Sequence, residues 1–287
     1  MAIVKMLSVL LISILSACTT TADRVLPNPA EHVEHAEVSY DEPPFASSVI
    51  DNCSVGCPLG GGAVTLHRQA YSLNNNSSTK FANWVAYRIT KASSATGRKR
   101  NWLADPDIPV GETLEPADYK GASRALKIDR GHQANLASMA GVADWRALNY
   151  LSNITPQKAD LNQGPWAHLE TLERELSKKE GVDSVYVVTG PLYERFIGTL
   201  PGTTKEHVIP SGYWKVIFTG DSPSDGFYAS FLMDQNTPRF ADFCDFQVTI
   251  EQIENRSGLK IWSGLNGEVK NTLSVEKGRL AAMIGCS

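Results

Sequence analysis

Apolar and polar positions along the chain predict several strands clustered around a few helices. Three short runs rich in β-branched and aromatic residues are typical of buried strands, and they span residues 81–90, 185–189 and 213–218. Residues 226–233 supply an antiparallel partner for the third run across a glycine- and proline-containing turn. Apolar residues at helical spacing predict helices over 166–176 and 251–257. Because strands and helices do not alternate strictly, the pattern predicts an α+β fold with a mostly antiparallel central sheet flanked by helices.

The start of the chain has a different pattern. Residues 1–17 combine one lysine with an apolar run that is too short to span a bilayer but suits an export signal. The run ends in Leu15-Ser16-Ala17-Cys18, which resembles the lipobox of bacterial lipoproteins, where the cysteine after the cleavage site is acylated. We therefore expect lipidation of Cys18 and an exported lipoprotein at the outer membrane or cell surface. The alternative is an ordinary secretory signal cut near Ala22, which would leave a periplasmic or secreted protein.

The next segment separates this signal from the rest of the chain. Residues 18–48 contain four prolines and six acidic residues against one arginine, without apolar periodicity. This composition predicts an acidic, extended tether. No internal repeat or second linker interrupts residues 49–287, which we interpret as one domain.

Four cysteines remain when Cys18 is set aside, and they are Cys53, Cys57, Cys244 and Cys286. An even number in an exported chain indicates disulfides, although four cysteines allow three pairings. A zinc site built from the C-x3-C pair and the two distant cysteines is the alternative.

Charge is distributed unevenly along the chain. The net charge of −4 argues against a partner bound simply by bulk positive charge, nucleic acid included. Two bases and six acids precede residue 49, however, which leaves 25 bases and 25 acids in the domain. Residues 52–104 contain no acid, and their bases are interleaved with aromatic residues. These bases are Arg68, Lys80, Arg88, Lys91, Arg98, Lys99 and Arg100. Such a stretch suits phosphate contacts and base stacking as well as it suits a solvated sheet face.

The residues able to carry chemistry lie mainly between positions 127 and 174. A D-R-G-H block contains His132, and Asn162, Trp166, Glu170 and Arg174 follow four residues apart, as one stripe along a helix would require. An imidazole can take a proton from water, guanidinium groups can stabilise charge on a phosphate, and an amide oxygen with nearby carboxylates can hold Mg²⁺. These residue types favour phosphodiester hydrolysis, and the common motifs of serine hydrolases, nucleotide-binding loops and zinc proteases are absent from the sequence.

Several separate blocks also match one family in order. The D-R-G-H block, SNITPQKADLNQGPW, NNNSSTKFANWVAYRIT and TGPLYER resemble the DNA/RNA non-specific endonucleases, over about residues 51–286. The resemblance implies a ββα-metal (His-Me finger) site set in an α+β domain. It also implies cleavage of single- and double-stranded DNA and RNA to 5′-phosphate ends with Mg²⁺, for which Mn²⁺ could substitute, and a homodimer.

The resemblance further implies roles for individual residues. His132 would be the general base that activates water, and Asn162 would be the single direct protein ligand of Mg²⁺. Glu170 would orient the waters on the metal, and Asp129 would support the site without binding the metal. Three arginines would hold the scissile phosphate: Arg100, Arg130 and Arg174. The disulfides of the family correspond to Cys53–Cys57 and Cys244–Cys286.

A second class of function is compatible with the same sequence. An envelope lipoprotein could bind nucleic acid through the basic stretch without cutting it. Every residue type that catalysis would require is nevertheless present, so the sequence favours the enzyme.

Overall fold

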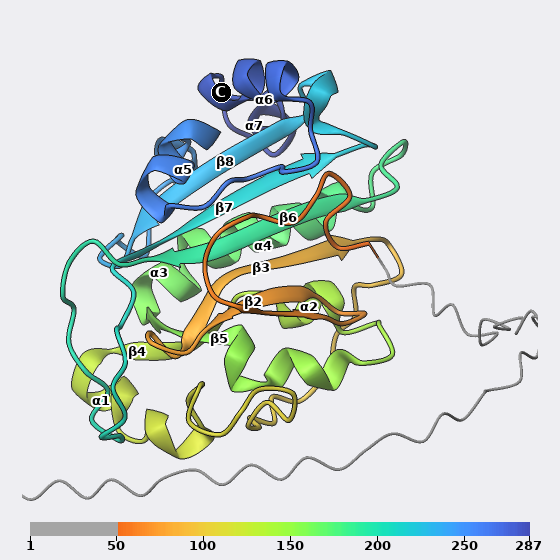
Figure 1. Cartoon of the computed structure of the whole chain (residues 1–287). Helices are drawn as coiled ribbons and strands as arrows, with labels where there is room; N and C mark the ends of the chain where they lie inside the picture. The colour runs from red at the N-terminus through yellow and green to blue at the C-terminus, as the bar shows by residue number, and fades with distance from the viewer. Residues whose placement is uncertain (1–50) are drawn as a thin grey trace, which may run out of the picture. The chain divides into compact units, whose positions relative to one another are not determined.

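Six strands, each antiparallel to its neighbours, form the central sheet in the order β1-β2-β3-β6-β7-β8 (Figure 1). The computed structural model describes residues 51–287. The strands are β1 (Val64–His67), β2 (Ser72–Asn76), β3 (Phe81–Ile89), β6 (Val185–Leu192), β7 (Gly212–Thr219) and β8 (Tyr228–Asp234). The four predicted strands are therefore confirmed. β6 runs past residue 189, where the predicted strand ends, and Pro191 still faces Tyr213 of β7 in the register.

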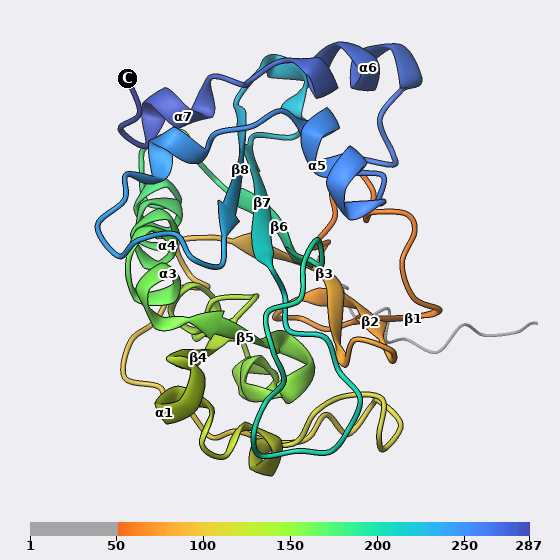
Figure 2. The ribbon, with the colours of Figure 1, turned by 90° about the vertical axis from the view of Figure 1, so that its left-hand side faces the viewer.

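Helices cover both faces of this sheet, as the edge-on view shows (Figure 2). The α-helices are α1 (Ala122–Leu126), α2 (Leu136–Met139), α3 (Ala159–Gln163), α4 (Pro165–Leu176), α5 (Ile250–Ser257), α6 (Gly267–Val275) and α7 (Leu280–Met283). Five 3₁₀ turns add η1 (Pro116–Tyr119), η2 (Trp145–Asn149), η3 (Leu151–Asn153), η4 (Pro223–Asp225) and η5 (Phe243–Phe246). Apolar residues of α3, α4 and α7 pack on one face of the sheet, and those of α5 and α6 pack on the other. The predicted α+β class is confirmed.

A separate two-stranded sheet leads into the helices that follow it. Strand β4 (Ile128–His132) pairs antiparallel with β5 (Ile154–Lys158), so that His132 faces Ile154 and Asp129 faces Gln157. The chain passes from β5 directly into α3 and then α4. Two antiparallel strands followed by a helix form the ββα unit that the resemblance implies.

The predicted stripe of four residues along one helix is wrong in one respect. The helix is interrupted at Gly164, so Asn162 lies on α3 while Trp166, Glu170 and Arg174 lie on α4. A side chain at position 164 would bring its Cβ within 2.3 Å of the carbonyl oxygen of Arg239. Trp166 points into the core, where its ring lies 5.8 Å from that of Tyr213.

One ion pair is buried between α4 and the sheet. Lys215 Nζ of β7 lies 2.7 Å from Glu173 Oε1 of α4, and both side chains are fully buried. Tyr87 of β3 donates a hydrogen bond to the other oxygen of Glu173 at 3.3 Å, and the ammonium lies 4.5 Å from the ring centroid of Trp166. Because unpaired charges are costly in a protein interior, this contact fixes α4 relative to β3 and β7.

Two disulfides close the described part of the chain. Cys53 is bonded to Cys57, and Cys244 is bonded to Cys286, which is the pairing that the resemblance implies. Since all four sulfur atoms are in these bonds, the alternative zinc site is wrong. The second bond joins η5 to the residues after α7, across 42 positions of sequence.

The predicted export signal, Cys18 and the tether lie outside the described residues. Within residues 51–287, no helix has both the length and the apolar character needed to cross a bilayer.

We expect Lys215→Met to lower the free energy of unfolding by about 3–5 kcal/mol, because it leaves the Glu173 carboxylate buried without its partner. Urea unfolding measures this loss. Lys260→Met is a matched control, since the Lys260 side chain is 65% exposed and lies 3.3 Å from Glu254, which keeps Lys270 as a partner at 2.9 Å. The control should change stability by about 0.5 kcal/mol or less. Equal small losses in both variants would contradict the role given to the buried pair.

Candidate active site

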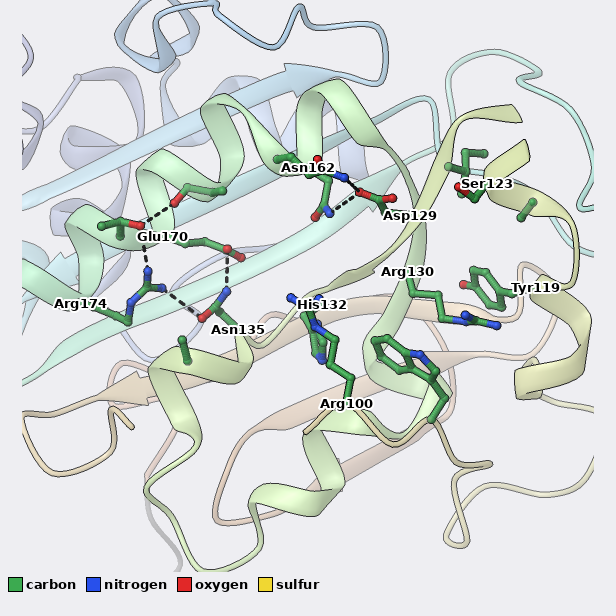
Figure 3. Close-up of a pocket in the computed structure, with 17 residues that line it drawn as sticks. Arg100, Tyr119, Ser123, Asp129, Arg130, His132, Asn135, Asn162, Glu170 and Arg174 are labelled. Atoms are coloured by element: carbon green, nitrogen blue, oxygen red, sulfur yellow. Dashed lines mark hydrogen bonds between the residues drawn. The ribbon is translucent and has the colours of Figure 1, made fainter. Parts of the chain in front are cut away.

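All seven side chains to which the sequence assigns catalytic, metal-binding or supporting roles line one pocket of about 570 Å³. They are Arg100, Asp129, Arg130, His132, Asn162, Glu170 and Arg174. They come from the loop after β3, from β4, from α3 and from α4. In Figure 3 the side chains of His132, Asn162 and Glu170 face a common space. The fold thus brings together residues that are up to 74 positions apart in the sequence.

Asp129 holds the amide of Asn162 in one orientation. Asn162 Nδ2 donates a hydrogen bond to Asp129 Oδ2 at 3.0 Å, and Gln163 Nε2 donates to the same oxygen at 2.7 Å. With its nitrogen bound to Asp129, the amide has its oxygen left to bind a ligand in the pocket. Asp129 therefore contacts the predicted metal ligand directly, and Gln163 of α3 binds the same carboxylate oxygen.

His132 lies at the end of β4 with its ring against the pocket. The ring centroid is 5.3 Å from that of Trp102, and its Nε2 atom is buried without a hydrogen-bond partner in the described part of the chain. Burial and the positive charge of Arg100 lower the pKa of His132 from 6.5 to about 3. At neutral pH the imidazole is therefore uncharged, which is the state that can accept a proton.

A hydrogen-bonded chain joins Glu170 to Arg174 through Asn135. Asn135 Nδ2 donates to Glu170 Oε2 at 2.6 Å, and Arg174 Nη1 donates to Asn135 Oδ1 at 3.1 Å. Burial raises the pKa of Glu170 to about 7, while the charge of Lys215 acts in the opposite direction. Asn135 also caps α2, since its oxygen accepts the N–H of Ser138 at 3.0 Å.

Two further arginines border the pocket. Arg130 donates to the carbonyl of Pro116 at 3.0 Å, and its guanidinium lies 5.1 Å from the ring centroid of Tyr119 and 5.5 Å from that of Trp102. Arg100 is exposed beside His132 (Figure 3). Neither arginine forms an ion pair with a carboxylate of residues 51–287, so both cations are available to an anion.

Sequence reasoning missed Asn135, Gln163 and Tyr119 at this pocket. Asn135 follows the D-R-G-H block by three residues and precedes a helical turn, so its capping role was readable. The contact of Asn135 with Glu170 could not be predicted from the sequence, because it joins residues 35 positions apart.

The donor set suits a hydrated divalent cation. Among the described residues, no group of three or more histidine, cysteine, aspartate or glutamate side chains could enclose a metal ion. The pocket instead offers the amide oxygen of Asn162 with the carboxylates of Asp129 and Glu170 nearby. Mg²⁺ retains several of its waters and needs few protein ligands, so these residues fit such an ion.

The family model described as DNA/RNA non-specific endonuclease matches residues 48–268. The chain belongs to this family. The endonuclease is 61% identical to a nuclease of Serratia marcescens over 238 residues, which cover 83% of this chain and 90% of the relative. Human mitochondrial endonuclease G is 29% identical over 225 residues, with 70% of each chain covered. A crystal structure of an EndoG/EndoGI complex shares the fold, with a TM-score of 0.61 at 24% identity over 74% of this chain and 90% of that chain.

The family match and the Serratia relative show that this protein is a metal-dependent nuclease acting on DNA and RNA. A protein that binds nucleic acid without cutting it is not favoured. The two disulfides of the endonuclease indicate that it is exported from the cytoplasm.

We expect Glu170→Gln to change how the stability of the endonuclease depends on pH. The pKa of Glu170 is about 7 in the folded chain against 4.5 for an ordinary glutamate, so the folded state binds the proton more tightly. The wild type should therefore lose about 3 kcal/mol of stability as pH rises from 4.5 to above 7, and the variant should not.

Thermal unfolding in EDTA at pH 4.5, 6 and 8 measures the difference between the two proteins. Glu175→Gln, at an exposed position of α4, is the matched control. A stability difference between Glu170→Gln and the wild type that does not grow with pH would contradict the elevated pKa.

Proposed function

We propose that this endonuclease hydrolyses phosphodiester bonds of single- and double-stranded DNA and RNA with Mg²⁺ and leaves 5′-phosphate ends. Mn²⁺ is the proposed substitute for Mg²⁺. The observation that carries the proposal is the convergence of His132, Asn162, Glu170 and the arginines on one pocket. An uncharged imidazole, an oriented amide oxygen and unpaired guanidinium groups are the groups that this reaction needs.

His132 is the proposed general base. Its Nε2 atom has no protein partner within residues 51–287, and the low pKa of the ring keeps that nitrogen unprotonated at neutral pH. A water molecule beside this nitrogen would give up its proton as it attacks phosphorus. The bond from phosphorus to the 3′ oxygen would break, which leaves the phosphate on the 5′ side of the downstream nucleotide.

Asn162 is the proposed metal ligand, and Asp129 keeps its oxygen in position through the 3.0 Å hydrogen bond. When bound, Mg²⁺ would supply positive charge to the phosphate and to the leaving oxygen. Glu170, held by Asn135, is placed to accept hydrogen bonds from waters on the ion. A water held by Glu170 in this way could pass a proton to the leaving oxygen.

Arg100, Arg130 and Arg174 are the proposed phosphate-binding residues. Arg130 is stacked on Tyr119 and Trp102, and Arg174 is fixed by Asn135 and by Thr171, whose oxygen lies 2.8 Å from Arg174 Nη2. Guanidinium groups ordered before substrate arrives can stabilise the charge that grows on the phosphate without rearranging.

The proposed organisation of the chain is an export signal over 1–17, a tether over 18–48 and the endonuclease domain over 49–287. Lipidation of Cys18, which would anchor the protein at the outer membrane or cell surface, rests on the Leu15–Cys18 motif. The homodimer rests on the family resemblance.

We expect His132→Ala to lower kcat by about 10²- to 10⁴-fold, because the reaction loses its proton acceptor. Initial rates on a fluorescent oligonucleotide with saturating Mg²⁺ measure the effect. His168→Ala is a matched control, since His168 is an exposed residue of α4 whose ring contacts Phe243 instead of the pocket. Near-wild-type turnover by His132→Ala would show that another group activates the water.

A further inference from the structure

A second groove opens directly beside the active-site pocket. It has a volume of about 660 Å³ and shares Arg100, His132, Asn135 and Ala137 with the pocket. Residues 95–100 form one wall, and the residues of α2 contribute to the other. The groove therefore continues from the place where the phosphodiester would be cleaved.

This groove carries positive charge that the protein leaves unneutralised. Arg98 and Lys99 are exposed on its wall, and neither has a carboxylate partner among the residues that the structure describes. Arg146 lies outside the residues that line the groove, but it contacts the same tryptophan ring as Arg98, is also exposed, and has no carboxylate partner among the described residues. The neighbouring carboxylate of Asp144 accepts the backbone N–H of Gln69 at 3.0 Å. The mechanism proposed above uses none of these three cations.

Trp145 orders two of the cations before any ligand binds. The guanidinium of Arg98 lies 4.6 Å from the ring centroid of Trp145, and that of Arg146 lies 5.1 Å from the same ring. Arg98 Nε also donates to the carbonyl of Ala140 at 3.2 Å. Its terminal nitrogens have no acceptor within residues 51–287, so they are free to bind an anion.

Backbone hydrogen bonds hold the basic wall against α2. The N–H of Ala95 donates to the carbonyl of Ala137 at 3.2 Å, and the N–H of Gly141 donates to the carbonyl of Ser93 at 2.8 Å. Ser93 Oγ donates to the carbonyl of Ser138 at 2.9 Å. A wall that is ordered in advance loses little conformational entropy when a ligand binds.

We propose that this groove is a second phosphate subsite, in which Arg98 and Lys99, together with the adjoining Arg146, bind backbone phosphates flanking the one that is cleaved. The ligand is a polynucleotide strand longer than a dinucleotide. Contacts to backbone phosphates carry no base information, which agrees with a nuclease that is not sequence-specific. The inference rests on the proposed position of the scissile phosphate beside His132.

The test compares a dinucleotide with a 20-nucleotide single-stranded DNA as substrates for Arg98→Ala, Lys99→Ala, Arg146→Ala and the triple variant. The subsite predicts unchanged kcat/KM on the dinucleotide and a KM for the 20-mer raised by about tenfold or more in the triple variant. The slope of log affinity against log salt should become shallower by about 0.7 for each cation removed.

Two further variants sharpen the comparison. Lys277→Ala removes an exposed positive charge outside the groove and should behave like the wild type on both substrates. Arg98→Lys keeps the charge but loses the planar group that stacks on Trp145. It should retain the salt slope of the wild type and bind the 20-mer less tightly.

Fluorescence anisotropy of the 20-mer in EDTA measures binding without catalysis. If the wild type binds but cuts nothing with Mg²⁺, while the triple variant binds less tightly, the subsite holds and the proposed function fails. Equal losses on the dinucleotide and the 20-mer overturn the subsite, and so does the absence of any loss on either substrate.

Discussion

The pocket depends on the buried contact of Lys215 with Glu173. These two charges lie on β7 and α4 and have no access to water, so α4 cannot rotate or shift without separating them. Glu170 and Arg174 flank Glu173 on the same helix, and their side chains reach the pocket. The positions of Glu170 and Arg174, to which we assign a catalytic and a phosphate-binding role, therefore follow from an ion pair on the core side of the helix.

The rest of the pocket is placed by the ββα unit and by the break that follows it. Asp129, Arg130 and His132 all lie on the short strand β4, and the register of β4 with β5 fixes their positions. Gly164 lets the carbonyl of Arg239 approach the chain and divides α3 from α4. Because of this division, Asn162 can bind Asp129 while α4 keeps the direction that its buried ion pair requires.

The sequence predicted the elements whose residues have strong local preferences. Strands β3, β6, β7 and β8 are apolar and β-branched, and the helix over 166–176 has apolar spacing, so all were found. Strand β2 was missed because asparagines are depleted in strands. Only the fold shows that Asn83 Nδ2 of β3 donates a hydrogen bond to Asn74 Oδ1 of β2 at 2.8 Å. The residue pattern indicated His132, Asn162, Glu170 and Arg174, and the family resemblance supplied the individual roles of the seven pocket residues. Asn135 and Lys215 could not be assigned, since their partners are 35 and 42 positions away.

A single amide oxygen, that of Asn162, is proposed to hold the metal in a pocket that α4 and the ββα unit shape together. The most direct test of this role is cleavage of supercoiled plasmid and of RNA by the wild type and by Asn162→Ala over a range of Mg²⁺ concentrations, with end-group analysis of the products. We expect the wild type to give fragments with 5′-phosphate ends, and EDTA to abolish this cleavage. Asn162→Ala should need far more Mg²⁺ than the wild type to reach the same rate of cleavage. Cleavage that persists in EDTA, or an unchanged Mg²⁺ requirement in the variant, would contradict the role of Asn162 as the metal ligand.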